Sequence, residues 1–164
     1  MILIPVTAED IDFAKEQIAA FEESEHGTWR YADVEAWRGI VCEILASRWL
    51  KSEFGAEVEA KGLDTTGICD EFDLLIHGKK IEIKSATKNY FRYIMPKIHD
   101  VRSLPKDIYI GVKYNETVEP NQIQIIGYIL HADVLKYPVK QNKGAPYYEI
   151  PIADLHPIEK LIFD

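Results

Sequence analysis

Residues 67–85 have the sequence GICDEFDLLIHGKKIEIKS, which predicts two β-strands joined by a tight turn. Apolar residues alternate with their neighbours along both halves of this stretch: Phe72, Leu74, Ile76, Ile81 and Ile83. A period of two is typical of strands with one buried face. Glycine adopts positive φ without strain, so His77-Gly78 can form a two-residue hairpin loop. In that register the numbers of paired residues sum to 155.

The other face of this predicted hairpin is charged. Asp73 lies opposite Glu82, and Glu71 lies opposite Lys84. Opposed side chains are about 5 Å apart at Cβ, so two facing carboxylates must share a proton, contact a cation or bind a metal. Carboxylate oxygens suit Mg²⁺, and the Lys84 ammonium can reach a water or phosphate beside Glu82. The alternative is an ordinary solvated strand face.

The same residues resemble a known motif. Asp73, followed after eight residues by Glu82-Ile83-Lys84, resembles the core motif of the PD-(D/E)xK nuclease superfamily, which has the restriction-endonuclease-like fold. The resemblance covers about residues 33–130. It implies a helix followed by three strands, in which the predicted hairpin supplies the second and third strands.

The resemblance also implies roles for individual residues. Asp73 and Glu82 would be ligands of Mg²⁺, with Mn²⁺ as a substitute, and the Ile83 backbone carbonyl would be a further ligand. Lys84 would orient or activate the nucleophile. The chain departs from the name-giving pattern because Phe72 stands where the motif has proline.

A helix is predicted from about Asp33, a plausible cap, to residue 53, with Gly55 as its stop signal. In the superfamily that the hairpin resembles, a helix before the hairpin often supplies a glutamate to the metal site. Glu43 lies near the edge of the apolar face and is matched to this role, as a metal ligand or as a base beside the metal. Glu35 is the second candidate, and a plain surface glutamate is the alternative.

Charge is unevenly distributed along the chain. The net charge is −8, which argues against a protein that coats nucleic acid, and residues 1–76 hold 6 Lys+Arg against 17 Asp+Glu. Residues 84–106, however, hold 6 basic residues against Asp100 alone. Basic side chains neutralise phosphates and aromatic rings stack on bases, so this region is predicted to contact nucleic acid. The residues concerned are Lys88, Tyr90, Arg92, Tyr93 and Lys97. A helix with an aromatic core face and a cationic solvent face is the alternative, and His99 and Asp100 are assigned no role.

The rest of the chain predicts an ordinary α/β arrangement. The expected elements are a helix capped by Thr7 and ending near Ser24, strands at 56–60, 107–114 and 122–130, a short helix at 131–136, a loop at 138–146 and an edge strand at 147–151. We expect a single domain over residues 1–164, with an N-terminal helix and connector at 1–32, the core at 33–130 and an accessory layer at 131–164. We assign the accessory layer no chemistry.

Taken together, the sequence predicts an α/β protein in which helices flank a central mixed sheet, and the resemblance implies that its core is restriction-endonuclease-like. The expected activity is that of a Mg²⁺-dependent endonuclease or exonuclease acting on a nucleic acid, most simply DNA, with a homodimer as a reasonable assembly. The alternative is a catalytically inactive structural or partner-binding module on the same fold. Cys42 and Cys69 lack metal-ligand spacing and suit buried thiols in a reducing cytoplasm. No apolar run is long enough for a membrane span, and the N-terminus does not resemble a signal peptide.

Overall fold

The computed structural model describes residues 1–22, 35–55 and 72–163. The expected strand at 56–60 lies outside these ranges, as do the Asp33 cap, Cys69 and Glu71. Within the ranges, no helix combines the length and the apolarity that crossing a bilayer requires.

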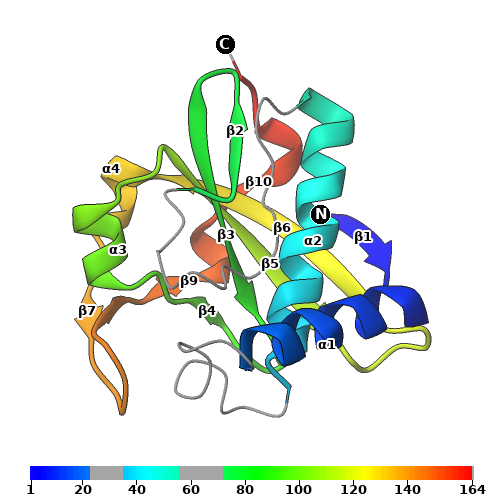
Figure 1. Ribbon diagram of the computed structural model, residues 1–164. Coiled ribbons are helices and arrows are strands. Elements are labelled where there is room, and N and C mark those ends of the chain that lie inside the picture. The colour runs from blue at the N-terminus through cyan, green and yellow to red at the C-terminus, as the bar shows by residue number, and fades with distance from the viewer. Residues whose placement is uncertain (23–34, 56–71, 164) are drawn as a thin grey trace.

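A curled mixed sheet forms the centre of the protein, and helices pack against it (Figure 1). Its strands lie in the order β1 (Ile2–Pro5), β6 (Gln122–Leu130), β5 (Ile108–Asn115), β3 (Lys79–Ala86) and β2 (Leu74–Ile76). The short strand β10 (His156–Pro157) also pairs with β6. β3 and β5 are parallel, whereas β1, β2, β10 and the β5–β6 pair are antiparallel to their neighbours. The predicted α/β class with a mixed sheet and flanking helices is confirmed.

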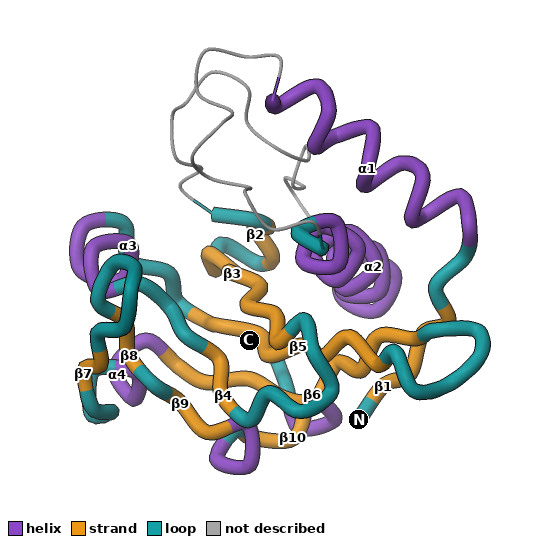
Figure 2. The backbone as a smooth tube through the Cα atoms, turned by 90° about the horizontal axis from the view of Figure 1, so that it is seen from below, coloured by secondary structure: helices purple, strands orange, loops and turns teal. Residues whose placement is uncertain are grey.

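The two faces of the sheet carry two separate cores. Helices α1 (Ala8–Glu22) and α2 (Trp37–Phe54) lie on one side, and strands β4 (Tyr93–Ile94) and β9 (Ile150–Pro151) lie on the other (Figure 2). The α2 side is filled by side chains that include Leu45, Leu50, Ile83, Ile110 and Ile125. The β4 side is filled by side chains that include Ile94, Val101, Tyr109, Ile129 and Ile150. Charged residues of β3 that point away from α2 therefore face the second, smaller core.

The β2–β3 hairpin has the predicted register. The observed pairs are Leu74–Ile81, Leu75–Lys80 and Ile76–Lys79. His77 and Gly78 form the loop with φ values of 48° and 74°, the two positive values that a type I′ turn requires. Phe72, expected in the strand, instead precedes β2, which begins at Leu74.

The two long helices begin and end for local reasons. Thr7 caps α1 as predicted, because its hydroxyl accepts from the Asp10 N–H at 3.2 Å and the Asp10 carboxylate accepts from the Thr7 N–H at 2.9 Å. α2 begins at Trp37, later than the expected start near Asp33. Residues 35 and 36 form a turn, in which each carbonyl accepts from the N–H three residues later and not four. The helix ends at Phe54, one residue beyond the predicted end, and the predicted stop residue Gly55 follows with φ 73°.

The segment between β3 and β5 is neither one helix nor a loop. It contains β4 and the short helix α3 (Ile98–Ser103), separated by Pro96, which cannot continue a helix. The expected edge strand at 147–151 is two short strands: β8 (Tyr147–Tyr148) pairs with β7 (Val139–Lys140), and β9 pairs with β4. The segment is therefore strand, as predicted, but it is divided between two small two-stranded sheets, and β7 lies inside the expected loop 138–146.

Both chain ends add to the sheet. β1, which the sequence analysis did not predict, pairs with the first half of β6, and β10 pairs with its second half. After β6 come α4 (His131–Val134) and two short 3₁₀ turns, η1 (Ile152–Asp154) and η2 (Ile158–Lys160). The strands at 107–114 and 122–130 were predicted to within one residue.

Candidate functional site

The candidate site lies where the chain enters β2 beside β3. We call this place, formed by Asp73 and by residues 82–84 of β3, the fork. Asp73 directly precedes β2, and its backbone N–H donates to the Ile81 carbonyl at 2.9 Å. Its carboxylate Oδ2 accepts from the backbone N–H of Ile83 at 2.6 Å. This hydrogen bond turns the Asp73 side chain toward β3, so the acid lies partly buried against the strand that carries Glu82 and Lys84.

Glu82 is held between two lysines. Lys84 Nζ lies 2.5 Å from Glu82 Oε1, and Lys106 Nζ lies 3.6 Å from Glu82 Oε2. The Glu82 side chain is 13% exposed, Lys84 is 25% exposed and Lys106 only 3%. Lys106 also donates to the Leu104 carbonyl at 2.8 Å, so this buried ammonium is anchored beside the carboxylate. Glu82 and Lys84 lie together as predicted.

Asp73 lies in the field of two other acids. Burial raises the pKa of Asp73 well above its ordinary value, and the charges of Glu43 and Glu82 raise it further. The Ile83 N–H and the Lys84 ammonium act in the opposite direction without reversing the shift. Asp73 therefore favours its protonated form where an unpaired acid on a surface would be ionised.

Helix α2 brings Glu43 to this site from a different part of the chain. Its charge acts on Asp73, which agrees with the position that was matched for the helix glutamate. Glu35, the second candidate, forms ion pairs with Arg38 at 3.2 Å and with Lys88. Of the two glutamates, Glu43 is the one whose charge acts on Asp73.

Sequence reasoning missed three residues of this site: Asp100, Lys106 and Tyr109. Burial alone would lower the pKa of Lys84, but the ion pair with Glu82 and the charges of Asp73 and Asp100 raise it above its ordinary value. Asp100, which was assigned no role because it is adjacent to His99, therefore contributes to the field at Lys84. Lys106 was counted only as one of six basic residues. Nothing in its spacing marked it as a partner of Glu82, because the contact depends on how the chain before β5 folds back.

Tyr109 is the third missed residue. It lies on β5 as the register partner of Glu82, so both side chains project from the same face of the sheet. Burial raises the pKa of Tyr109 to about 12, and the nearby Glu82 charge acts in the same direction. Its phenol stays protonated at neutral pH and closes the buried side of the site.

The donor set suits a hard cation in charge and in chemistry. Asp73, Glu82 and Glu43 supply carboxylate oxygens, the ligands that Mg²⁺ prefers. A divalent ion would also relieve the repulsion that raises the pKa of Asp73. In the arrangement seen here, the Glu82 oxygens face lysines. Among residues 1–22, 35–55 and 72–163, no three His, Cys, Asp or Glu side chains are grouped closely enough to hold a metal ion.

The residues predicted to contact nucleic acid lie along the segment between β3 and α3. Tyr90, Arg92, Tyr93 and Lys97 are exposed, Tyr90 to 61% and Tyr93 to 41%. Arg92 donates to the Asn89 carbonyl at 3.1 Å. Lys88 is partly buried and ion-paired to Glu35, so its charge is already neutralised.

Comparison with models of known protein families, with curated proteins and with solved structures finds no match to this chain. The site is therefore interpreted from its own residues.

Proposed function

We propose that this protein is a metal-dependent nuclease with a restriction-endonuclease-like core, which hydrolyses phosphodiester bonds in DNA. The observation that carries the proposal is the arrangement at the fork. Asp73, Glu82 and Lys84 lie together on the hairpin, and the charge of Glu43 acts on Asp73 from α2. The resemblance of the Asp73 to Lys84 spacing to the PD-(D/E)xK motif supports the same function.

In this proposal the carboxylates of Asp73 and Glu82 hold Mg²⁺ or Mn²⁺, together with the Ile83 carbonyl and with help from Glu43. When bound, the ion supplies Lewis-acid polarisation of the scissile phosphate and lowers the pKa of a water molecule. Burial alone would lower the pKa of Lys84, but in the metal-free site the ion pair with Glu82 and the charges of Asp73 and Asp100 raise it. In this proposal the Lys84 ammonium would orient the attacking water and stabilise negative charge.

Lys106 and the Asp73–Ile83 hydrogen bond position these groups. Lys106 holds Glu82 from the buried side through a contact of 3.6 Å. The backbone N–H of Ile83 restricts the Asp73 carboxylate to the β3 side of the fork. Cleavage of both strands of a duplex takes two such sites, so a homodimer is part of the proposal for a double-strand cutter.

The test is cleavage of plasmid, single-stranded DNA, branched DNA and RNA with Mg²⁺, with Mn²⁺ and with EDTA. We expect metal-dependent cleavage that Glu82→Gln and Lys84→Met abolish. Asp133→Asn serves as the matched control, because Asp133 is an acid on α4 that pairs with Lys136 outside the site. Absence of metal-dependent cleavage on every substrate, or equal cleavage by Glu82→Gln, would exclude the nuclease.

One observation favours a non-catalytic module as the second candidate. Lys84 and Lys106 already neutralise Glu82, and the raised pKa of Asp73 favours its uncharged form, so the site is electrostatically satisfied without a metal. Isothermal titration with Mg²⁺ and Mn²⁺ separates the two functions. A nuclease site shows saturable binding that Asp73→Asn and Glu82→Gln weaken, whereas a purely structural cluster shows none.

A further inference from the structure

A cavity of about 320 Å³ lies on the sheet face that carries Glu82 and Lys84. Its walls are residues 91–93, Lys113 of β5 and residues 151–153. Its volume is at the lower end of the range for small-ligand sites, about 300–1,000 Å³. Lys113 pairs in register with Ala86, which is two residues, or about 7 Å, beyond Lys84 on β3.

Two cations meet at one edge of this cavity. Lys113 Nζ donates to the Asn89 carbonyl at 2.6 Å, and an Arg92 guanidinium nitrogen donates to the same oxygen at 3.1 Å. Burial lowers the pKa of Lys113, and the positive charge of Arg92 lowers it further. Among the residues that the structure describes, those lining the cavity include no acid, so an anion is the ligand that would relieve this repulsion.

The remaining walls are apolar and aromatic. They include Phe91, Tyr93 and Ile152, and the Tyr93 side chain is 41% exposed. Such walls suit a flat aromatic group, since base–aromatic stacking contributes about 1–3 kcal/mol per base. The cavity thus combines a cationic edge with walls that can contact a nucleobase.

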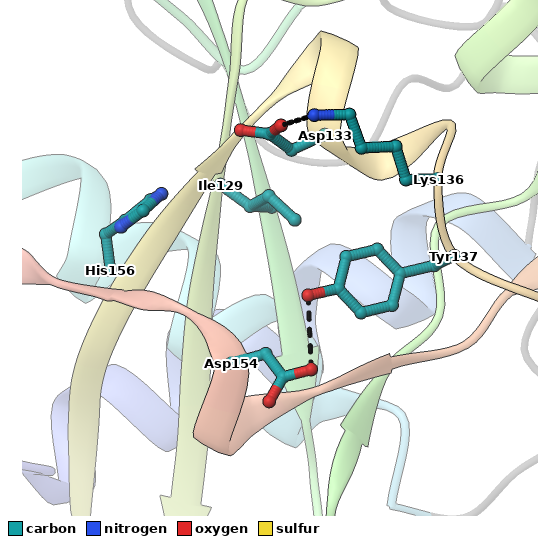
Figure 3. Close-up of a pocket in the computed structure, with 6 residues that line it drawn as sticks. All are labelled: Ile129, Asp133, Lys136, Tyr137, Asp154 and His156. Carbon is teal, nitrogen blue, oxygen red and sulfur yellow. Dashed lines mark hydrogen bonds and ion pairs between the residues drawn. The ribbon is translucent and has the colours of Figure 1, made fainter.

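A second cavity, of about 330 Å³, differs in its charges. Figure 3 shows Lys136 turned toward Asp133 and Tyr137 turned toward Asp154. These contacts are an ion pair of 2.6 Å and a hydrogen bond of 3.2 Å from the Tyr137 hydroxyl to Asp154 Oδ2. Because the charges of Asp133 and Lys136 pair with each other, this cavity has no comparable demand for an anion.

We propose that the cavity beside Arg92 and Lys113 binds a single unpaired nucleotide. The two cations bind its phosphate, and Phe91, Tyr93 and Ile152 contact its base. Bases inside a duplex are stacked and paired, and extruding one costs free energy, so a nucleotide from a single-stranded region is favoured. This inference rests on the proposed function in one respect: it takes the nucleotide to be part of the strand that the neighbouring Asp73–Glu82 site cleaves.

The test is fluorescence anisotropy in EDTA, where metal-dependent cleavage does not occur. The probes are a labelled short single-stranded DNA and a blunt duplex of the same sequence, with a nucleoside 5′-monophosphate and inorganic phosphate as competitors. We expect tighter binding of the single strand than of the duplex, and stronger competition by the nucleotide than by phosphate. Equal affinity for the two DNAs, or equal competition by phosphate, would overturn the proposal.

Variants assign the phosphate contact. Arg92→Gln and Lys113→Gln should each weaken single-strand binding about tenfold, since each removes a charge-assisted hydrogen bond. Each should also reduce the slope of log affinity against log salt by about 0.7, a change that a purely structural role would not produce. Lys143→Gln, an exposed lysine outside the cavity, is the matched control. Equal effects in all three variants would contradict the assignment.

A further variant assigns the base contact. Tyr93→Leu should weaken binding about fivefold or more and leave the salt slope unchanged. Phe13→Leu, an exposed aromatic residue on α1, is its control. Equal effects of Tyr93→Leu and Phe13→Leu would contradict the base contact.

The outcomes separate this inference from the nuclease. If binding depends on Arg92 and Lys113 but no metal-dependent cleavage occurs, the nucleotide site is supported and the proposed nuclease function is contradicted. If Glu82→Gln abolishes cleavage but Arg92→Gln and Lys113→Gln leave KM unchanged, the nuclease function is supported and the nucleotide site is contradicted.

Discussion

Asp73 Oδ2 accepts a hydrogen bond of 2.6 Å from the backbone N–H of Ile83, across the entrance to the β2–β3 hairpin. This contact joins the two halves of the spaced motif and points an acid at the strand that carries Glu82 and Lys84. It also holds a carboxylate in a place where burial and two other acids disfavour its charge. The same residue is therefore held in place by a hydrogen bond while its charged form is disfavoured.

The free energy of unfolding should depend on pH because the pKa of Asp73 is raised in the folded protein. Because the pKa of Asp73 is raised above the unfolded value of about 3.9, its contribution to stability is fully present below pH ~4 and is lost as pH rises through the folded-state pKa. Asp73→Asn removes that loss. The variant should gain stability relative to the wild type between pH 4 and pH 8 in urea unfolding. A difference that is constant with pH would contradict this expectation.

Addition of a divalent cation should act on the same residue. At pH 8 a bound ion stabilises the ionised carboxylate, so millimolar Mg²⁺ should raise the Tm of the wild type. Asp73→Asn should show a smaller shift. Ca²⁺-free buffer with EDTA sets the baseline, and an equal rise in both proteins would point to a cation effect elsewhere.

Lys106 should contribute to stability through its contacts in the buried part of the site. Lys106→Met keeps most of the apolar stem but leaves the Leu104 carbonyl without its 2.8 Å donor and Glu82 with one cation fewer. We expect a loss of about 1–3 kcal/mol in the free energy of unfolding. Lys140→Met, at an exposed position in β7, is the control, and equal losses would show that the buried ammonium is dispensable.

Two glycines of the sheet should differ in their tolerance of a methyl group. A Cβ at Gly111 would lie 2.3 Å from Leu155 Cδ1, the end of a side chain that can move. A Cβ at Gly127 would lie 2.2 Å from the His156 carbonyl oxygen, which β10 holds in place. Gly111→Ala should therefore cost about 1–3 kcal/mol, and Gly127→Ala should cost more. Thermal unfolding of the pair measures the order, and the reverse order would contradict the packing.

The cap of α1 should contribute to the stability of the folded protein with a pH dependence opposite to that of Asp73. Burial alone would raise the pKa of Asp10, but the hydrogen bonds from Thr7 and the Arg48 charge lower it. Its stabilising contribution is thus present above pH ~3.9 and is lost as pH falls through the folded-state pKa. Thr7→Ala should cost about 1 kcal/mol at pH 7, the usual value of a cap. Asp10→Asn should lose less stability than the wild type on acidification from pH 5 to pH 2.5.

The sequence by itself determined the parts of the protein that short-range interactions specify. The hairpin register follows from the alternation of Leu74, Ile76 and Ile81, because a one-residue slip would expose every apolar side chain. The turn follows from glycine at position 78, and the cap of α1 follows from Thr7 three residues before Asp10. The pairing of Glu82 with Lys84 follows from two-residue spacing on one strand.

Only the tertiary structure decided which distant charges complete the site. Glu43 acts on Asp73 because α2 packs on the sheet, and Lys106 reaches Glu82 because the chain folds back before β5. The Asn89 carbonyl likewise accepts from Lys113, which comes from a distant segment, beside its local contact with Arg92. Such contacts depend on the packing of whole elements, and no local periodicity encodes them. For the same reason β9 joins β4 and not the main sheet, since strand partners are chosen by the available edge as well as by strand propensity.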